Sequence, residues 1–235
     1  PSAYMKRLLF LLAALLFIAS CATPPSYREP ETSRRAYNVK GIRTLEIDAR
    51  NSNIALKGDQ QTDVQVYDTP DKYYREGNTL YLEINNAEQF RLKVPRTTRV
   101  SVQNSNGTLF ISEVIGDIEA DLNNTEVFII NPGRELEIDT TNSPINIVKR
   151  AGRIEEYSAS TTNADIHAII PPENLNIELE TTNGYFNIKN LPVTVMERNS
   201  EEYVGYIGNR TSGKLSLETT NSSITLEPVG KNNGA

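Results

Sequence analysis

The sequence predicts an all-β protein, a single-domain β-solenoid built from repeated strand-turn-strand coils of about 19 residues. Three observations predict it: a twelve-residue segment recurs, apolar and polar residues alternate on both sides of its centre, and an asparagine marks each centre. Alternation with a period of two is typical of β-strands, and asparagine tolerates the left-handed backbone of a sharp corner. A β-sandwich is the alternative all-β fold, but sandwiches do not normally repeat one turn sequence at a fixed period.

The N-terminal residues 1–20 are predicted to be a lipoprotein signal peptide, with a short extension before Met5. A basic start precedes an apolar run over residues 8–18, which is shorter than the roughly 20 residues that span a bilayer. The motif Ile18-Ala19-Ser20-Cys21 resembles the lipobox of bacterial lipoproteins, and this cysteine is the only one in the chain. The resemblance implies that Cys21 becomes lipidated after the peptide before it is cleaved.

Residues 21–38 are predicted to be the lipidated cysteine and a flexible tether, because they are polar, rich in proline and without apolar periodicity. Two or three acyl chains hold a protein stably on a membrane. We therefore expect a lipid-anchored protein of the cell envelope. The outer membrane is the expected location if the organism has two membranes, and the outer face of the cytoplasmic membrane otherwise.

The repeats define a predicted β-solenoid domain over residues 39–228, followed by a tail over residues 229–235. The seven segments are LEIDARNSNIAL from Leu45, VSVQNSNGTLFI from Val100, IEADLNNTEVFI from Ile118, LEIDTTNSPINI from Leu136, YSASTTNADIHA from Tyr157, IELETTNGYFNI from Ile177 and LSLETTNSSITL from Leu215. The predicted turn ladder consists of their central asparagines, Asn51, Asn106, Asn124, Asn142, Asn163, Asn183 and Asn221.

The spacing between these asparagines indicates about ten stacked coils. Successive distances of 55, 18, 18, 21, 20 and 38 residues correspond to about three, one, one, one, one and two coils. Two polar or tyrosine-bearing stretches, residues 68–78 and 195–209, depart from the pattern. We expect them to be loops that project from the rod.

Acidic residues recur at the second and fourth positions of the segments, which should point outward and stack into a stripe. The candidate binding residues among them are Glu119, Asp121, Glu137, Asp139, Glu178 and Glu180; Glu46, Asp48 and Glu218 occupy equivalent positions. Such a stripe suits Ca²⁺ or a cationic partner, although it is also typical of a solvated face that discourages edge pairing. Serines interrupt the stripe, and no calcium-loop motif is present.

Tyrosines in the two irregular stretches are further candidates for binding, because an aromatic ring with a polar tip suits carbohydrate or protein contacts. Packing of loops onto the rod is the structural alternative. The candidate tyrosines are Tyr73, Tyr74, Tyr203 and Tyr206.

Composition excludes several classes of function. The formal charge of −6 includes two basic residues and no acid within residues 1–20, so the mature chain has a charge of −8, which disfavours nucleic acid as a partner. One cysteine and one histidine exclude a Cys/His zinc site, a Cys/His catalytic pair and an intrachain disulfide framework. We predict no cofactor, no metal and no catalytic residue, although closely spaced carboxylates leave a glycan-active enzyme as a minor alternative.

The run from Leu92 to Leu226, with its xVPxxxxLxVxxxNGxIxI rhythm and repeated TTNG or TTNS turns, resembles the bacterial "putative adhesin" domain family and the related head-GIN domains. The resemblance implies a β-solenoid rod on a cell-envelope protein and supplies no catalytic residues. The turn Asn123-Asn124-Thr125 and the insert at residues 195–209 depart from the family pattern.

We therefore expect a non-catalytic cell-envelope lipoprotein with an adhesive, scaffolding or ligand-binding role. Its expected partners are the membrane, through the lipid anchor, and an envelope protein, a glycan or a cationic peptide. The alternative is an envelope-stress or regulatory module that binds cationic peptides or a membrane protein, which the mature charge of −8 favours.

Overall fold

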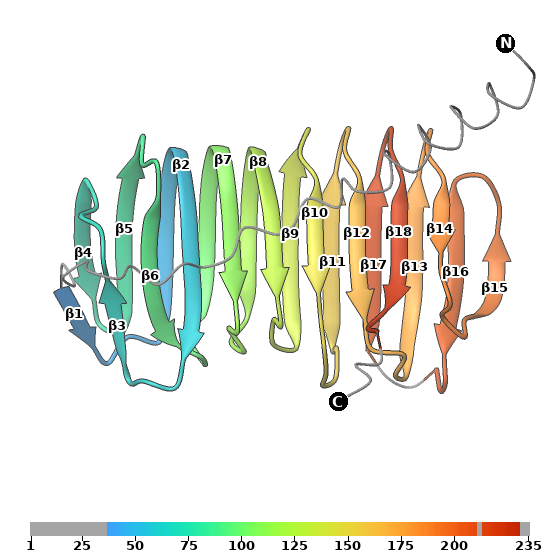
Figure 1. The fold of residues 1–235 in the computed structure, drawn as a ribbon, viewed down its shortest axis with the longest axis horizontal. Helices are drawn as coiled ribbons and strands as arrows, with labels where there is room; N and C mark the ends of the chain where they lie inside the picture. Colours follow the sequence, from blue (N-terminus) through green and yellow to red (C-terminus); the bar gives the residue numbers. More distant parts are fainter. Residues whose placement is uncertain (1–36, 211–212, 231–235) are drawn as a thin grey trace, which may run out of the picture.

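The computed structural model describes residues 37–210 and 213–230, which form eighteen β-strands and no helix. This confirms the all-β class. The strands join into one large sheet (Figure 1). The predicted signal peptide, Cys21, most of the tether and the last five residues of the tail lie outside the described residues.

Eight strand-turn-strand units, called coils below, stack side by side. In each one a strand of a first ladder is followed by a turn and a strand of a second ladder. The first ladder contains, in stacking order, β5 (Thr79–Asn85), the first halves of β2 (Thr44–Asp59), β7 (Arg99–Ser112) and β8 (Ile118–Ile130), and then β9 (Glu135–Thr141), β11 (Glu156–Thr161), β17 (Lys214–Thr219) and β13 (Leu175–Thr181). All of these strands pair in parallel, whereas the sheets of a β-sandwich are antiparallel.

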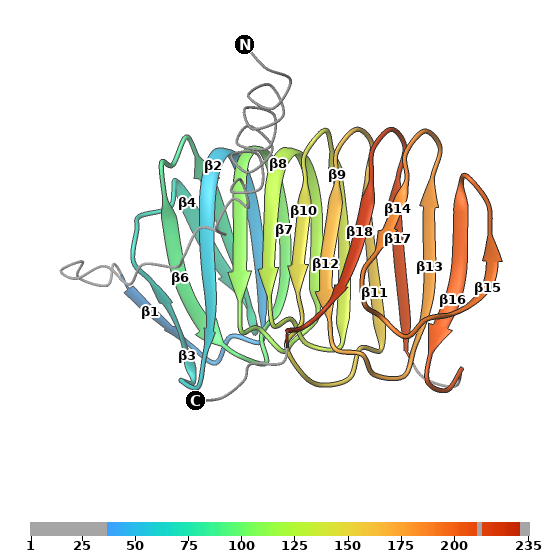
Figure 2. The ribbon, with the colours of Figure 1, turned by 45° about the vertical axis from the view of Figure 1, so that its right-hand side comes forward.

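The second ladder repeats the same stacking order on the opposite side of the core. It contains β6 (Phe90–Pro95), the second halves of β2, β7 and β8, and then β10 (Ile145–Val148), β12 (Ile166–Ile170), β18 (Ile224–Pro228) and β14 (Phe186–Ile188). These pairings are parallel as well. Its strands run opposite to those of the first ladder, as the arrowheads in Figure 2 show.

The core lies between the two ladders, where alternate residues of both ladders meet. Leu45, Leu56, Leu109 and Ile129, for example, are fully buried. Each of the seven predicted segments forms one coil, because its apolar positions face inward on both sides of the asparagine turn. Burial of these ladders of aliphatic side chains supplies the main favourable free energy of folding.

The eighth coil, residues 79–95, escaped the twelve-residue pattern because its turn is longer by one residue. Leu80 pairs with Leu45, 35 positions earlier, but Phe90 pairs with Ile54, 36 positions earlier. The expected count of about ten coils was wrong. The remaining length of the chain forms strands that cap the two ends.

The stacking order departs from the order of the sequence at both ends. The first coil in the chain, residues 44–59, lies between residues 79–95 on one side and residues 99–112 on the other. The last coil, residues 214–228, lies between residues 156–170 and residues 175–188. The chain therefore places its terminal coils in the second position from each end of the stack.

Antiparallel strands cap the ladders at both ends. The caps are β4 (Lys72–Glu76) on β5, β3 (Asp63–Val66) on β6 with β1 (Tyr37–Lys40) on β3, and β16 (Glu202–Ile207) on β13 with β15 (Thr194–Arg198) on β16. The prediction that residues 68–78 and 195–209 are projecting loops was therefore wrong, because both stretches contain capping strands. Such strands hide the hydrogen-bonding edges of the parallel ladders.

Candidate binding surface

The outer surface of the first ladder carries two columns of side chains, because every second residue of a strand points away from the core. Parallel register sets equivalent residues of neighbouring coils side by side. Column one contains Tyr81, Glu46, Ser101, Glu119, Glu137, Ser158, Ser216 and Glu178, and column two contains Glu83, Asp48, Gln103, Asp121, Asp139, Ser160, Glu218 and Glu180. We call this surface the acidic face.

Uncharged side chains divide the acidic face into three patches. The first contains Glu46, Asp48 and Glu83, the middle one Glu119, Asp121, Glu137 and Asp139, and the third Glu178, Glu180 and Glu218. The third patch could not be predicted from sequence order, because it forms only when β17 inserts beside β13 and sets Glu218 next to Glu180.

Each patch contains one ion pair, which leaves most of its carboxylates uncompensated. The pairs are Lys72–Glu83 at 2.7 Å, Arg99–Glu119 at 3.4 Å and Lys214–Glu178 at 2.6 Å. Within the described residues, no lysine or arginine lies within ion-pair distance of Glu46, Asp48, Asp121 or Glu137. The face therefore presents a net negative potential that attracts cationic groups.

Like charges lie close together in the third patch. Partial burial, followed by the negative charges of Glu218, Glu178 and Glu202, raises the pKa of Glu180 above its ordinary value. Glu202 lies directly beside Glu180 on the capping strand β16. A bound cation would relieve this repulsion and return the pKa of Glu180 towards its ordinary value.

An aromatic pair flanks the first patch. The rings of Tyr74 on β4 and Tyr81 on β5 stack with centroids 4.3 Å apart and an interplanar angle of 6°. Beside them lies a hollow of about 300 Å³, whose lining includes these rings, Glu46, Asp48 and Gln103. An exposed ring next to carboxylates and an amide can hold a cationic or a hydroxyl-rich ligand.

The four predicted tyrosines have different environments. Tyr73 and Tyr74 lie on β4 with 58% and 59% of their surface exposed. Tyr203 is buried at 5% exposure against the tilted ring of Phe186, and Tyr206 is partly covered, so the structure does not bring all four into one surface. The packing alternative therefore describes Tyr203, whereas Tyr73 and Tyr74 present exposed rings on β4.

The seven predicted asparagines form a continuous hydrogen-bonded row along the turns between the two ladders, and Asn86 of the eighth coil extends it. In each pair the Nδ2 of one asparagine donates to the Oδ1 of its neighbour. The row runs Asn86, Asn51, Asn106, Asn124, Asn142, Asn163, Asn221 and Asn183, with donor–acceptor distances of 2.6–3.3 Å.

Left-handed backbone explains only part of this row. Asn51, Asn106, Asn124 and Asn142 have φ between 49° and 69°, as expected for asparagine at a sharp corner. Asn163, Asn183 and Asn221 do not have positive φ, yet their side chains continue the row. In these three coils the side-chain hydrogen bonds, and not the backbone conformation, explain why the turn position is asparagine.

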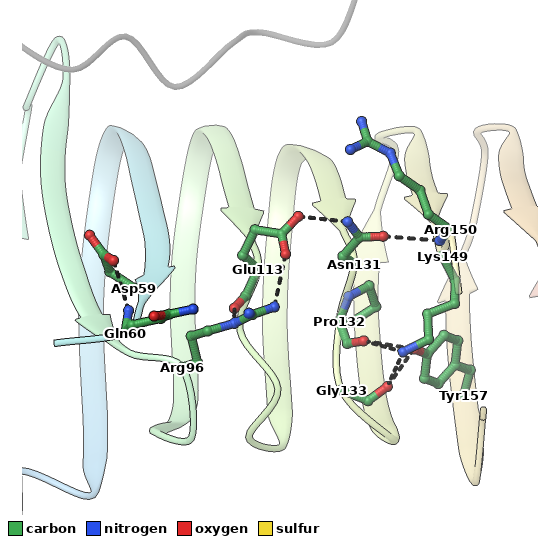
Figure 3. Close-up of polar contacts among 10 residues, drawn as sticks. All are labelled: Asp59, Gln60, Arg96, Glu113, Asn131, Pro132, Gly133, Lys149, Arg150 and Tyr157. Atoms are coloured by element: carbon green, nitrogen blue, oxygen red, sulfur yellow. Dashed lines mark hydrogen bonds and ion pairs between the residues drawn. The ribbon is translucent and has the colours of Figure 1, made fainter. Parts of the chain in front are cut away.

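A second polar cluster, which sequence reasoning missed, lies where the second-ladder strands return to the first ladder (Figure 3). Asn131 has φ of 50° and donates from Nδ2 to Glu113 Oε1 at 2.6 Å. The buried Lys149 donates from Nζ to the carbonyl oxygen of Pro132 at 2.6 Å, and burial lowers its pKa. In the sequence, the only indication of this cluster is a single polar residue after each apolar strand.

The described part of the chain contains neither a metal-binding cluster nor a membrane-spanning helix. No group of three or more histidine, cysteine, aspartate or glutamate side chains in residues 37–210 and 213–230 is arranged to hold a metal ion. In the same residues there is no helix long and apolar enough to cross a membrane.

No protein-family model and no curated protein matches the chain. Among solved structures, the crystal structure of a putative cell adhesion protein from Clostridium sporogenes is similar at a TM-score of 0.49 and 11% sequence identity, over 82% of this chain and 97% of that one. Similarity at this level does not establish a family. The resemblance to the "putative adhesin" domain family therefore stays a prediction.

Proposed function

We propose that this chain is a non-catalytic, lipid-anchored cell-envelope protein whose β-solenoid displays the acidic face to a partner. The observation that carries the proposal is the acidic face itself. Its parallel register places carboxylates without ion-pair partners in three patches, and exposed tyrosines lie at one end of it. A rigid rod of this kind is suited to adhesion, scaffolding or ligand display, because its side chains keep fixed spacings.

The solenoid assignment is supported by the two parallel ladders, by their shared stacking order and by the asparagine row. In a solenoid each coil contacts mainly its neighbours, so stability is roughly a sum of coil and interface contributions. Parallel pairing between the predicted segments also supports the assignment. We propose the "putative adhesin" type of solenoid on this basis.

The lipid anchor is tested by replacing Cys21. We expect the wild-type protein to fractionate with membranes and to incorporate labelled palmitate, and a Cys21→Ala variant to lose both properties, because no second cysteine can be acylated. The location of the labelled protein, in the outer or the cytoplasmic membrane, then follows from separation of the two membranes. Membrane association of the variant without label would contradict the anchor.

The binding role is tested by capture of envelope proteins and glycans on immobilised residues 22–235, which include every described strand. A Tyr74→Ser variant reports on the aromatic pair, and a variant carrying Asp121→Asn and Glu137→Gln reports on the middle patch. We expect wild-type protein to capture a component that at least one variant fails to capture. Equal capture by all three proteins would refute a role for the acidic face.

The second candidate is a regulatory module that binds cationic peptides or a membrane protein, and the uncompensated carboxylates favour it. Salt distinguishes the two candidates, because exposed charges are screened at high ionic strength. Capture that 0.5 M salt abolishes, and that the carboxylate variant loses, supports the regulatory module. Salt-resistant capture lost in the Tyr74→Ser variant supports adhesion or scaffolding.

A further inference from the structure

The two ladders end at different depths at the C-terminal end of the stack. The first ladder continues beyond β13 with β16 and β15, which extend past the other strands at the right of Figure 2. The second ladder stops at β14, and no strand formed by the described residues pairs with its outer edge. The end of the molecule is therefore stepped: the first ladder overhangs the second by two strands.

The backbone of β14 exposes unused hydrogen-bonding groups on this step. Ile224 N–H donates to Tyr185 O at 3.1 Å, and Lys189 N–H donates to Leu226 O at 2.9 Å. Because successive residues of a strand point their N–H and C=O groups to opposite sides, those of Phe186 and Ile188 point away from β18. Unpaired edges of this kind readily pair with another strand, and the other three ladder ends are covered by antiparallel caps.

A hollow lined by both apolar and polar residues lies beside the unpaired edge. Its volume is about 290 Å³, and its lining includes Phe186, Ile188, Leu191, Val193 and Tyr203, together with Asn187 and Arg198. The first four side chains are only partly buried against the core. They therefore form an end of the core that lacks the covering strand present on the first ladder.

The overhanging strand β15 has the complementary character. All five of its residues are exposed, and Val195 and Met196 expose 47% and 53% of their surface. These are two of the few large apolar side chains exposed in the described part of the chain. Exposed apolar residues on an edge strand mark a surface that gains free energy by burial.

We propose that a second copy of this chain occupies the step, in a head-to-head dimer with a two-fold axis parallel to the strands. Rotation about such an axis sets the first ladder of one copy in line with the second ladder of the other. The overhang of each copy, about 10 Å deep for two strands, then fills the step of its partner. Each β15 pairs with β14 of the other copy, and the contact is made twice, as symmetry requires.

Strand direction is compatible with this arrangement. Strand β15 is antiparallel to β16, which is antiparallel to β13, so β15 runs in the direction of the first ladder. The strands of the second ladder run in the opposite direction (Figure 1). The two-fold axis preserves these directions, so β15 and β14 meet as an antiparallel pair, with Val195, which lies opposite the inward Gly205, on the side of the hollow.

Sedimentation equilibrium of residues 22–235 tests the dimer. We expect a reversible monomer–dimer equilibrium, and at least a tenfold weaker association when Val195→Lys and Met196→Lys are combined, because the charges would oppose burial. The control is Ile115→Lys, which alters an equally exposed apolar residue (48%) outside the step and should leave the association constant unchanged. A monomer at all concentrations up to about 100 µM would overturn the proposal.

Disulfide cross-linking tests the arrangement of the two copies. Residues 22–235 contain no cysteine, so Thr194→Cys and Asn187→Cys variants carry one thiol each, and both positions lie on the outward face of their strands. We expect oxidation of their mixture to give cross-linked heterodimers. An added Ile188→Pro change removes an outward N–H of β14 and should lower the yield of these heterodimers at least fivefold. A dimer without this cross-link, or a monomer whose β14 instead binds an added extended peptide, would refute the two-fold arrangement.

Discussion

Replacing single asparagines of the row separates the contribution of their side chains from that of the backbone. Asn124 has φ of 49°, donates to Asn106 at 3.3 Å and accepts from Asn142 at 3.2 Å. Asn163 makes the two equivalent hydrogen bonds, both at 2.6 Å, without positive φ. The two sites therefore differ mainly in backbone conformation.

We expect Asn163→Ala to lower the free energy of unfolding by about 1–2 kcal/mol, because two exposed hydrogen bonds contribute about 0.5–1 kcal/mol each. At Asn124 alanine should cost about 2–4 kcal/mol, since a left-handed residue with a Cβ adds about 1–2 kcal/mol. Glycine reverses the order between the sites. Asn124→Gly should be more stable than Asn124→Ala, whereas Asn163→Gly should be less stable than Asn163→Ala by about 0.5–1 kcal/mol.

Urea unfolding followed by far-ultraviolet circular dichroism measures these differences as shifts of the midpoint at constant slope. The sign of the alanine–glycine difference is the decisive quantity, because the lost hydrogen bonds are the same for both substitutions at one site. If the sign is the same at Asn124 and at Asn163, left-handed backbone does not distinguish the two groups of turns. If neither alanine variant is less stable than wild type, the hydrogen-bonded row does not stabilise the fold.

Three further predictions test other parts of the structure. A Cβ on Gly58 would lie 2.1 Å from a backbone carbonyl oxygen, so Gly58→Ala should cost at least about 2 kcal/mol in urea unfolding, whereas Gly77→Ala, with open space but φ of 56°, should cost about 1 kcal/mol. Burial alone would raise the pKa of Asp165, but hydrogen bonds from Ser222 and Ser223 outweigh this effect and lower the pKa. The ionised carboxylate therefore stabilises the fold at neutral pH, and this stabilisation is lost as the pH falls through the lowered pKa. An Asp165→Asn variant should therefore show a smaller fall in urea midpoint between pH 7 and pH 3 than wild type. Lys149 and Tyr157 donate to the same two buried carbonyl oxygens, so Lys149→Met and Tyr157→Phe should each cost about 1 kcal/mol or less, and their combination should exceed the sum by about 1–2 kcal/mol in a double-mutant cycle.

The composition of each coil could be predicted from the sequence because it depends on local patterns. Alternation of apolar residues selects the buried face of a strand, and an asparagine with small polar neighbours allows the corner. The seven segments therefore lie where the repeat predicted them. The eighth coil was missed because one additional residue in the turn around Asn86 shifts its second strand out of the twelve-residue pattern.

The candidate surface was only partly predictable, because it depends on which coils are neighbours. Outward carboxylates follow from alternation alone, and adjacent coils such as those of Glu119 and Glu137 also follow from the sequence. The proximity of Glu218 to Glu180 does not, since these residues come from coils that are not consecutive. Burial of Tyr203 depends on β16 and β15, a cap whose irregular sequence resembles a loop.

Sequence spacing misled about stacking order for a physical reason. The 55 residues between Asn51 and Asn106 suggested three coils, yet the two side chains are hydrogen-bonded neighbours at 3.0 Å. The intervening chain forms a coil on the other side of Asn51 and then crosses back. Hydrogen bonds along a ladder stabilise neighbouring coils whatever their separation along the chain. A longer connection between two coils adds only a small entropic cost.

The insertion of both terminal coils also bears on where the molecule can associate. A terminal coil in the second position has both of its strand edges paired. The outermost coil at each end is therefore an internal segment of the chain, and the residues before or after it can form capping strands. At the N-terminal end β4 and β3 cover both ladders. At the C-terminal end the same design covers only the first ladder, so the step at β14 is a specific exception to a rule that the rest of the fold obeys.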